Sequence, residues 1–318
     1  MSRIEQIRET LAAELGFVLP QIRIRDQMEL PPGGYRIIVR ENSVAEGELR
    51  VNDYLAMEVG PVTEQIEGIP TQEPTNNQPA MWITADQREH AQLVGYLVVD
   101  PASVLATHLI ETIKKHADRL LTRQDVQKLI DRLKSDHPVL IDEVVPSLVA
   151  LGVVQKILQN LLKEGVSIRD LVTVLEALAD HSTTTKDVVL LTEGVRQHLG
   201  ATICGAYLSP EAVLEYIALG DSAEQIIADA IRETPEGGYQ FLAIEPNLGY
   251  QLVNAIANTI TEVAGLQAQP LILCSRSIIR AYLRQFLEIQ FPTALPVLSL
   301  EEIPPTIQLR EVGRIELT

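Results

Sequence analysis

The stretch GYLVVDPASVLATHLIETIKKHADRLLTRQ (residues 95–124) decides the fold, because its hydrophobic pattern changes period halfway along. The run YLVVD is short, apolar and rich in β-branched residues, which is typical of a buried strand. Pro101 follows at the first position of a helix, where a missing N–H costs no hydrogen bond. Helical spacing then continues to about Leu120. The sequence therefore predicts a strand that leads directly into a long helix.

The same helix carries His108, Glu111 and His116, which raises the question of a metal or acid/base site. The two histidines are eight residues apart, which places them about 12 Å apart along a helix axis. Zinc sites built on one helix use histidines four residues apart, with a third ligand nearby. We therefore expect surface or half-buried histidines at these positions and no bound metal.

The residues before this stretch predict a β-rich region. Residues 1–15 have the apolar spacing of a helix, which Gly16 ends. Isoleucines and arginines then alternate over residues 22–25, and apolar side chains recur at every second position over 35–39. Both runs are typical of half-buried strands, separated by turns at LPPGG and ENSVAEGE. Residues 61–80 hold four prolines and predict a surface loop without regular structure.

Helix-start signals flank the quoted stretch on both sides. Thr84 and Gln87 form a capping box at the start of a helix predicted over 85–94, and Gly95 ends that helix. Thr122 and Asp125 have the same spacing at the start of a helix predicted over 122–135. Three short helices separated by Gly and Ser/Thr turns follow within 140–200, which predicts a small bundle. From about residue 207, strands and helices alternate as βαβαβ.

Composition excludes several functional classes. The 318 residues carry a net charge of −17 with no Lys/Arg-rich run, so nucleic acid and anionic lipid are disfavoured as partners. Cys204 and Cys274 are far apart and are interpreted as buried, reduced thiols. The sequence predicts no membrane span, because Lys156 and amide side chains interrupt the most apolar stretch. The first sixteen residues lack the apolar centre of a signal peptide.

Enzyme motifs are absent from the sequence. The two GGY triplets, at 33–35 and 237–239, do not lie in a phosphate-loop frame and are interpreted as turns. No GxSxG, HExxH or calcium-loop pattern occurs. The acidic pairs are typical of solvated faces. We therefore predict a binding protein with no cofactor and no metal, and we keep as an alternative an α/β hydrolase or transferase whose site is not recognisable in the sequence.

Long strings of this sequence resemble the cytoplasmic domain of the large export-gate protein of flagellar biosynthesis and type III secretion. These strings are GYLVVDPASVLATHL, RQDVQKLID, LLKEGVSIRDLVTVLEALAD and PVLSLEEIPPTIQLREVGRIEL. The resemblance covers nearly the whole chain. One departure is Thr122, which stands where the family commonly has glycine before RQ. Full-length members carry transmembrane helices before this domain, so the resemblance implies that residues 1–15 are the linker to an absent membrane part.

The resemblance implies an α+β or α/β multidomain fold of four subdomains. The first is split and β-rich (16–82 and 121–138), and the second is an inserted αβ subdomain (83–120). The third is a helical bundle (139–206) and the fourth is an α/β layer (207–318). The resemblance also implies a ring of nine subunits at the cytoplasmic face of the bacterial inner membrane. Its implied partners are export chaperone–substrate complexes, the export ATPase complex and the substrate-specificity switch protein.

The resemblance implies that the cleft between the first two subdomains receives chaperones, which answers the question raised by the opening stretch. The cleft candidates are Leu93, Tyr96, Asp100, Gln124 and Asp125. An exposed aromatic would give an apolar anchor, and the polar residues would bond a partner. Tyr96 is equally compatible with ordinary core packing.

The helical subdomain provides candidates for contacts between neighbouring subunits of the ring. These are Arg169, Asp170, Glu193 and Arg196. The run IRD at 168–170 is also typical of a salt bridge at a helix start within one subunit, and we favour that interpretation. The likeness is closer to the flagellar branch than to the injectisome branch, which stays as the alternative.

Overall fold

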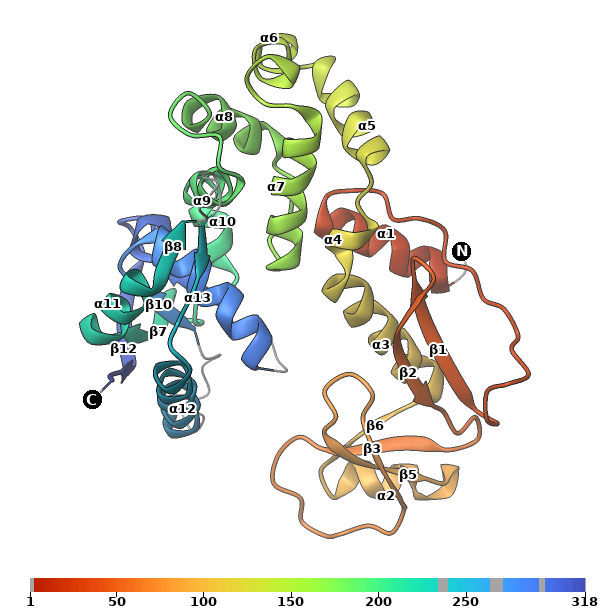
Figure 1. Cartoon of the computed structure of the whole chain (residues 1–318). Helices are drawn as coiled ribbons and strands as arrows, with labels where there is room; N and C mark the ends of the chain where they lie inside the picture. Colours follow the sequence, from red (N-terminus) through yellow and green to blue (C-terminus); the bar gives the residue numbers. More distant parts are fainter. Residues whose placement is uncertain (1–2, 234–239, 264–270, 292–294, 318) are drawn as a thin grey trace. The chain divides into compact units, whose positions relative to one another are not determined.

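The computed structural model describes residues 3–233, 240–263, 271–291 and 295–317, and it divides into two compact units. The first unit comprises residues 1–126 and 167–169, and the second comprises 127–166 and 170–318. Figure 1 labels the elements along the chain. Among the described residues, no single helix is long and apolar enough to cross a membrane. Only a pair bent by 103°, Pro138–Leu148 with Leu151–Lys163, reaches the required length and composition.

The first unit combines helices with a hairpin and a four-stranded sheet. Helix α1 (Arg3–Leu15) ends at Gly16, whose φ of +95° suits glycine. Strands β1 (Gly34–Val39) and β2 (Asn42–Glu48) pair antiparallel as an isolated hairpin. The larger sheet has the order β4-β5-β3-β6 and is antiparallel throughout. Its strands are β3 (Tyr54–Glu58), β4 (Ile69–Gln72), β5 (Pro79–Ile83) and β6 (Tyr96–Val99).

Helices cover both faces of this sheet. Helix α2 (Arg88–Leu93), preceded by the 3-10 turn η1 (Ala85–Gln87), packs on the face that holds Tyr96. The long helix α3 (Pro101–Lys115) buries Val104 against the opposite face, which holds Trp82. Strand alternation places Tyr96 and Val98 on the first face and Leu97 and Val99 on the second. The predicted strand that leads directly into a helix is therefore observed in β6 and α3.

The second unit contains a helical block and a parallel sheet. After α4 (Ala117–Leu120), α5 (Arg123–Lys134) carries the chain from the first unit into the second. The block consists of α6 (Pro138–Glu143), η2 (Val144–Leu148), α7 (Leu151–Lys163), α8 (Leu171–His181), α9 (Val188–His198) and α10 (Gly200–Gly205). Its fully buried side chains are aliphatic, as the 4% aromatic content requires. They include Val154, Ile157, Leu158, Leu161, Leu175, Leu178 and Val195.

The parallel sheet of the second unit has the order β11-β10-β7-β12. Its strands are β7 (Val213–Leu219), β10 (Ile272–Cys274), β11 (Val297–Ser299) and β12 (Gln308–Ile315). The helices around this sheet are α11 (Asp221–Ala230), α12 (Pro246–Val263), α13 (Ser277–Gln290) and η3 (Leu300–Glu302). Strands β8 (Ile231–Glu233) and β9 (Gln240–Leu242) form a separate antiparallel pair. Strands β10 and β11 are buried throughout and read as continuous apolar runs in the sequence, whereas most of β12 is exposed.

Several sequence predictions are wrong in detail. The alternating residues 22–25 form no strand, and the predicted turn at ENSVAEGE is strand β2. The predicted loop 61–80 contains β4 and the start of β5. The helix predicted to reach Leu120 breaks at His116. The predicted triplet 237–239 lies outside the described residues.

The four-subdomain division stays a prediction, but one of its boundaries cuts through the larger sheet. Strand β6 lies in the predicted inserted subdomain, 83–120, and pairs with β3 of the predicted first subdomain. Because β3 also pairs with β5, the sheet spans the predicted boundary at residue 83. A backbone hydrogen-bonded sheet is a single structural element, so the two segments share one core.

Candidate functional site

The cleft candidates nearest to β6 have different environments. Leu93, at the end of α2, is 84% exposed, whereas Tyr96 is 4% exposed. The Tyr96 hydroxyl donates to Oε1 of Glu58 at 3.1 Å and to Oε1 of Gln65 at 3.3 Å. A buried tyrosine with a bonded hydroxyl belongs to the core. Of the two interpretations left open for Tyr96, the structure supports core packing.

Asp100 works as the N-cap of α3. Its Oδ1 accepts the backbone N–H of Ser103 at 3.0 Å, and its other oxygen accepts the Ser103 hydroxyl. The hydroxyl bond is the main cause that lowers the pKa of Asp100. Two of the carboxylate's acceptor positions are therefore used within the chain, and the exposed remainder faces solvent.

Gln124 and Asp125 lie at the other end of α3, near the start of α5. Asp125 and Thr122 form the predicted capping box: Thr122 N–H donates to Oδ2 of Asp125, and Asp125 N–H donates to Oγ1 of Thr122, both at 3.2 Å. The fifteen residues of α3 separate this box from Asp100, which corresponds to roughly 22 Å of helix. Figure 1 shows α3 running between the two positions. The structure therefore does not bring the five cleft candidates into one pocket.

The exposed apolar side chain that the sequence reading missed is Leu97. It is 46% exposed on β6, which is an edge strand with one unpaired side among the described residues. The sequence shows that Leu97 and Tyr96 lie on opposite faces of a strand. It does not show which face of that strand α3 leaves exposed at Leu97. Leu93, on α2 at the Tyr96 face, and Leu97, on the opposite face of β6, are therefore exposed apolar side chains that flank Gly95; we call these two residues the β6 margin.

The histidine question has a structural answer on the same helix. His108 is 6% exposed, and its Nδ1 lies 2.6 Å from the Tyr35 hydroxyl of β1. Burial lowers the pKa of His108 and raises that of Tyr35 to about 12, so a neutral imidazole accepts from a neutral phenol. Glu111 instead lies 3.9 Å from Lys114. Within the described residues, no three His, Cys, Asp or Glu side chains are grouped to hold a metal ion.

The ring candidates divide into an exposed pair and a buried pair. Arg169 and Asp170 are exposed, and Asp170 caps α8 by accepting the Thr173 N–H at 3.2 Å. Glu193 and Arg196 are 3% and 2% exposed and point into the second unit. Their charges are satisfied inside one chain, so the structure assigns them an internal role and leaves the exposed pair as candidates for a subunit contact.

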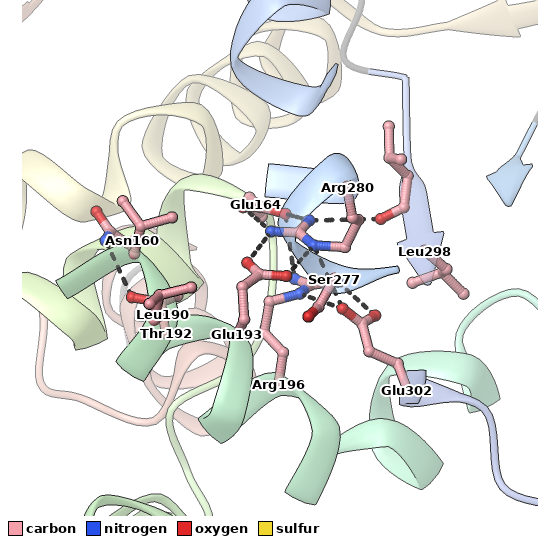
Figure 2. A network of polar contacts seen from close by, with 12 residues as sticks. Asn160, Glu164, Leu190, Thr192, Glu193, Arg196, Ser277, Arg280, Leu298 and Glu302 are labelled. Atoms are coloured by element: carbon pink, nitrogen blue, oxygen red, sulfur yellow. Dashed lines mark hydrogen bonds and ion pairs between the residues drawn. The ribbon is translucent and has the colours of Figure 1, made fainter. Parts of the chain in front are cut away.

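Glu193 and Arg196 belong to a buried charge network, shown in Figure 2, that the sequence reading did not assemble. Arg280 of α13 donates to Oε2 of Glu193 at 2.6 Å and to Oε2 of Glu164 at 2.7 Å. Arg196 of α9 holds both oxygens of Glu302, at 2.9 and 3.0 Å. The sequence signal was weak, because the five members are spread over residues 164–302 and each resembles an ordinary surface charge.

Three carboxylates face the guanidiniums of Arg196 and Arg280 in this network. The pKa values of Arg196 and Arg280 lie above the ordinary arginine range. Burial acts to raise the pKa of Glu164, but Arg280 and Arg196, together with the nearby Arg284, outweigh it and lower that pKa to about 2. For Glu193, burial prevails and raises the pKa. The network joins α7, α9, α13 and η3, and so ties the helical block to the α/β layer.

Comparisons with known proteins cover the whole chain. The flagellar biosynthesis protein FlhA of Bacillus subtilis is 42% identical over 317 residues, which is 100% of this chain and 46% of that protein. The Chlamydia pneumoniae CdsV protein, solved in complex with CdsO, has a TM-score of 0.86 at 29% identity, covering 98% of this chain and 89% of that one.

A nonameric cytosolic domain, that of EscV from a type III secretion system, has a TM-score of 0.77 at 28% identity, covering 99% of this chain and 91% of that one. The chain spans about half the length of the curated relatives it matches. Those relatives are flagellar biosynthesis proteins. The FHIPEP family model matches residues 1–308. The chain therefore belongs to the FHIPEP family.

Proposed function

We propose that this chain is the docking platform of a type III protein export gate and that it works in flagellar assembly. The observation that carries the proposal is the match along the whole chain to FlhA, at 42% identity. The CdsV structure matches at 29% identity, and the EscV domain from a type III secretion system matches at 28%. The higher identity to the flagellar relatives supports the flagellar branch over the injectisome branch.

The proposed location is the cytoplasmic face of the bacterial inner membrane, where nine copies form a ring. The nonameric cytosolic domain of EscV supports this arrangement by its structural similarity. The exposed Arg169 and Asp170 are the proposed contacts to a neighbouring copy. Both lie on the surface where the chain crosses between its two units.

The proposed partners are export chaperone–substrate complexes, the export ATPase complex and the substrate-specificity switch protein. The solved complex of CdsV with CdsO supports a docking role, because a protein of the same fold binds another protein there. A net charge of −17 favours partners that present basic surfaces to this chain.

The proposed docking surface for chaperones is the β6 margin. Leu93 and Leu97 supply exposed apolar anchors, which are the kind of side chain that dominates binding energy at interfaces. The unpaired edge of β6 supplies backbone donors and acceptors that an extended peptide can use. Asp100 follows the strand directly and adds a carboxylate that remains partly open to solvent.

The test compares Leu93→Asp and Leu97→Asp by calorimetry against a purified flagellar chaperone–substrate complex. Val139→Asp is the matched control, because Val139 is 79% exposed in the other unit. We expect the two margin variants to bind at least about tenfold more weakly and the control to bind normally. Unchanged affinity in both margin variants would remove the β6 margin from the docking surface.

A further inference from the structure

Residues 20–26 form a strand-like segment that has no strand partner within the chain. Isoleucines and arginines alternate over residues 22–25, yet no strand is formed there. Ile24 is 76% exposed. Across the described residues, no backbone group of 21–26 has a hydrogen bond to another part of the chain. A period-two sequence with free backbone groups is suited to pair with an edge strand.

The segment is anchored to the rest of the chain at its N-terminal end. Phe17 and Leu19 are buried, and the guanidinium of Arg8 donates to the carbonyl oxygens of Leu19 at 2.8 Å and Pro20 at 3.1 Å. Anchoring one end lowers the entropy that pairing of the residues after it would cost.

The same unit contains an incomplete sheet. Strands β1 and β2 pair only with each other, so the hairpin has an unpaired edge on β2. A lone two-stranded hairpin is marginal in water, and a third strand stabilises it. The β2 edge is acidic: the side chain of Glu46 is 74% exposed, and Glu48 is exposed.

We propose that residues 20–26 of one copy add as a third, antiparallel strand to the β2 edge of a second copy. The register that places Arg25 beside Glu46 also places Arg23 beside Glu48, so two opposite-charge cross-strand pairs form. Glu46 would then lie between Arg25 of one copy and its own Arg36, which is 3.8 Å away. Ile24 would lie opposite Gly47, over which the Tyr35 ring packs.

Charge and symmetry both favour a second copy as the occupant. A basic strand meets an acidic edge, within a chain whose net charge is −17. The segment and the edge are different surfaces of one chain, so the contact is head-to-tail, and such contacts form a ring when the rotation between copies closes. This inference rests on the ring in the proposed function, which the nonameric EscV domain supports.

Disulfide cross-linking between two introduced cysteines tests the proposed register of residues 20–26 against β2, in the protein expressed from its own gene. Arg25→Cys combined with Glu46→Cys is expected to give disulfide-linked ladders between copies under mild oxidation. Arg25→Cys with Val51→Cys is the matched control, because Val51 is 81% exposed but lies beyond β2. The native cysteines do not compete, since Cys204 and Cys274 are buried. Equal cross-linking of both pairs, or of neither, overturns the proposal.

A proline variant separates backbone pairing from side-chain contact. Ile24→Pro removes an N–H that has no partner inside the chain, so the fold is retained while strand addition is blocked. We expect self-association measured by sedimentation to weaken about tenfold more for Ile24→Pro than for Ile24→Ala. Equal effects of the two variants overturn strand pairing. If rings form normally with Ile24→Pro, this inference is overturned and the proposed function is left intact. If the strand pairs normally but the chain binds no chaperone, only the proposed function is contradicted.

Discussion

Gly16 is the residue where the end of α1 meets a distant part of the chain. Its φ is +95°, and a Cβ there would lie 2.4 Å from the backbone nitrogen of Arg169. Around it, Ile168 N–H donates to the Leu15 carbonyl at 2.9 Å, and the Ser167 hydroxyl donates to the Glu14 carbonyl at 2.6 Å. The glycine therefore allows residues 167–169 to pack against α1.

We predict that Gly16→Ala destabilises the protein more than Gly165→Ala does. Gly165 also has a positive φ, +74°, but nothing lies within 4 Å of its would-be Cβ. The control thus carries only the backbone strain, on the order of 1 kcal/mol, whereas Gly16→Ala adds a clash with fixed backbone. Urea unfolding measures the difference. Equal losses for the two variants would mean that the close approach at Gly16 is not maintained in solution.

Arg280 is the most demanding residue of the buried charge network. Replacing it with methionine leaves Glu193 buried without the guanidinium it bonds and leaves Glu164 paired only with Arg196, which is expected to cost about 3–5 kcal/mol. Arg310→Met is the control, because Arg310 and Glu215 form an exposed pair worth about 1 kcal/mol or less. Chemical denaturation checks both variants. A loss at Arg280 as small as that at Arg310 would contradict the network's structural role.

Glu164 gives the network a pH dependence of known sign. Its pKa falls from an ordinary 4.5 to about 2 in the folded protein, so its stabilising effect is complete above about pH 4.5 and is lost as the pH falls toward 2. Glu193 has a raised pKa and therefore opposes folding in its charged form.

The difference in unfolding free energy between the wild type and Glu164→Gln isolates the Glu164 contribution. We expect this difference to be largest near neutral pH, at most roughly 3 kcal/mol, and to shrink as the pH falls from 4.5 to 2. Urea titrations at several pH values measure it. A difference that stays constant over this range would show that Glu164 is not held ionised by the two arginines.

Tyr96 is a cleft candidate whose side chain the structure buries in the core of the first unit. We predict that Tyr96→Phe costs about 1 kcal/mol, because it removes the hydroxyl that donates to Glu58 and Gln65. Tyr96→Ala should cost about 3–5 kcal/mol by leaving a cavity. Thermal unfolding tests both. If Tyr96→Ala unfolded at nearly the wild-type temperature, Tyr96 would be an exposed residue and not part of the core.

At the scale of elements, caps and periodicity were readable because they are local. The capping boxes at Thr84 and Thr122 are formed as predicted, and so are β6 and the start of α3. The strand at residues 22–25 was predicted by the same alternation that predicts β1, but a strand also needs a partner. That partner lies in no local pattern, which is why the prediction failed there and held over 34–39.

The Asp100 cap gives a test at this scale. Asp100→Ala removes the acceptor for Ser103 N–H and is expected to cost about 1 kcal/mol, whereas Asp100→Asn keeps an acceptor and should cost less. Hydrogen exchange of the first turn of α3 is the direct readout. Equal protection in the two variants would show that the side chain does not cap the helix.

At the scale of the whole molecule, the family could be read from the sequence, but the site could not. The five cleft residues were chosen by their place in the chain, and α3 separates Asp100 from Gln124 and Asp125 by its full length. The larger sheet joins residues on both sides of the boundary predicted at 83. Which exposed side chains share a surface depends on these long-range pairings, as does the burial of Glu193 and Arg196.

We propose above that this chain acts by binding export proteins. Calorimetric titration of the wild-type chain with a purified flagellar chaperone–substrate complex tests this proposal most directly. We expect saturable binding that the β6 margin variants weaken. The contradicting result is the absence of binding at concentrations up to about 100 μM, well above the range of ordinary docking affinities, by a chain that still shows an intact unfolding transition.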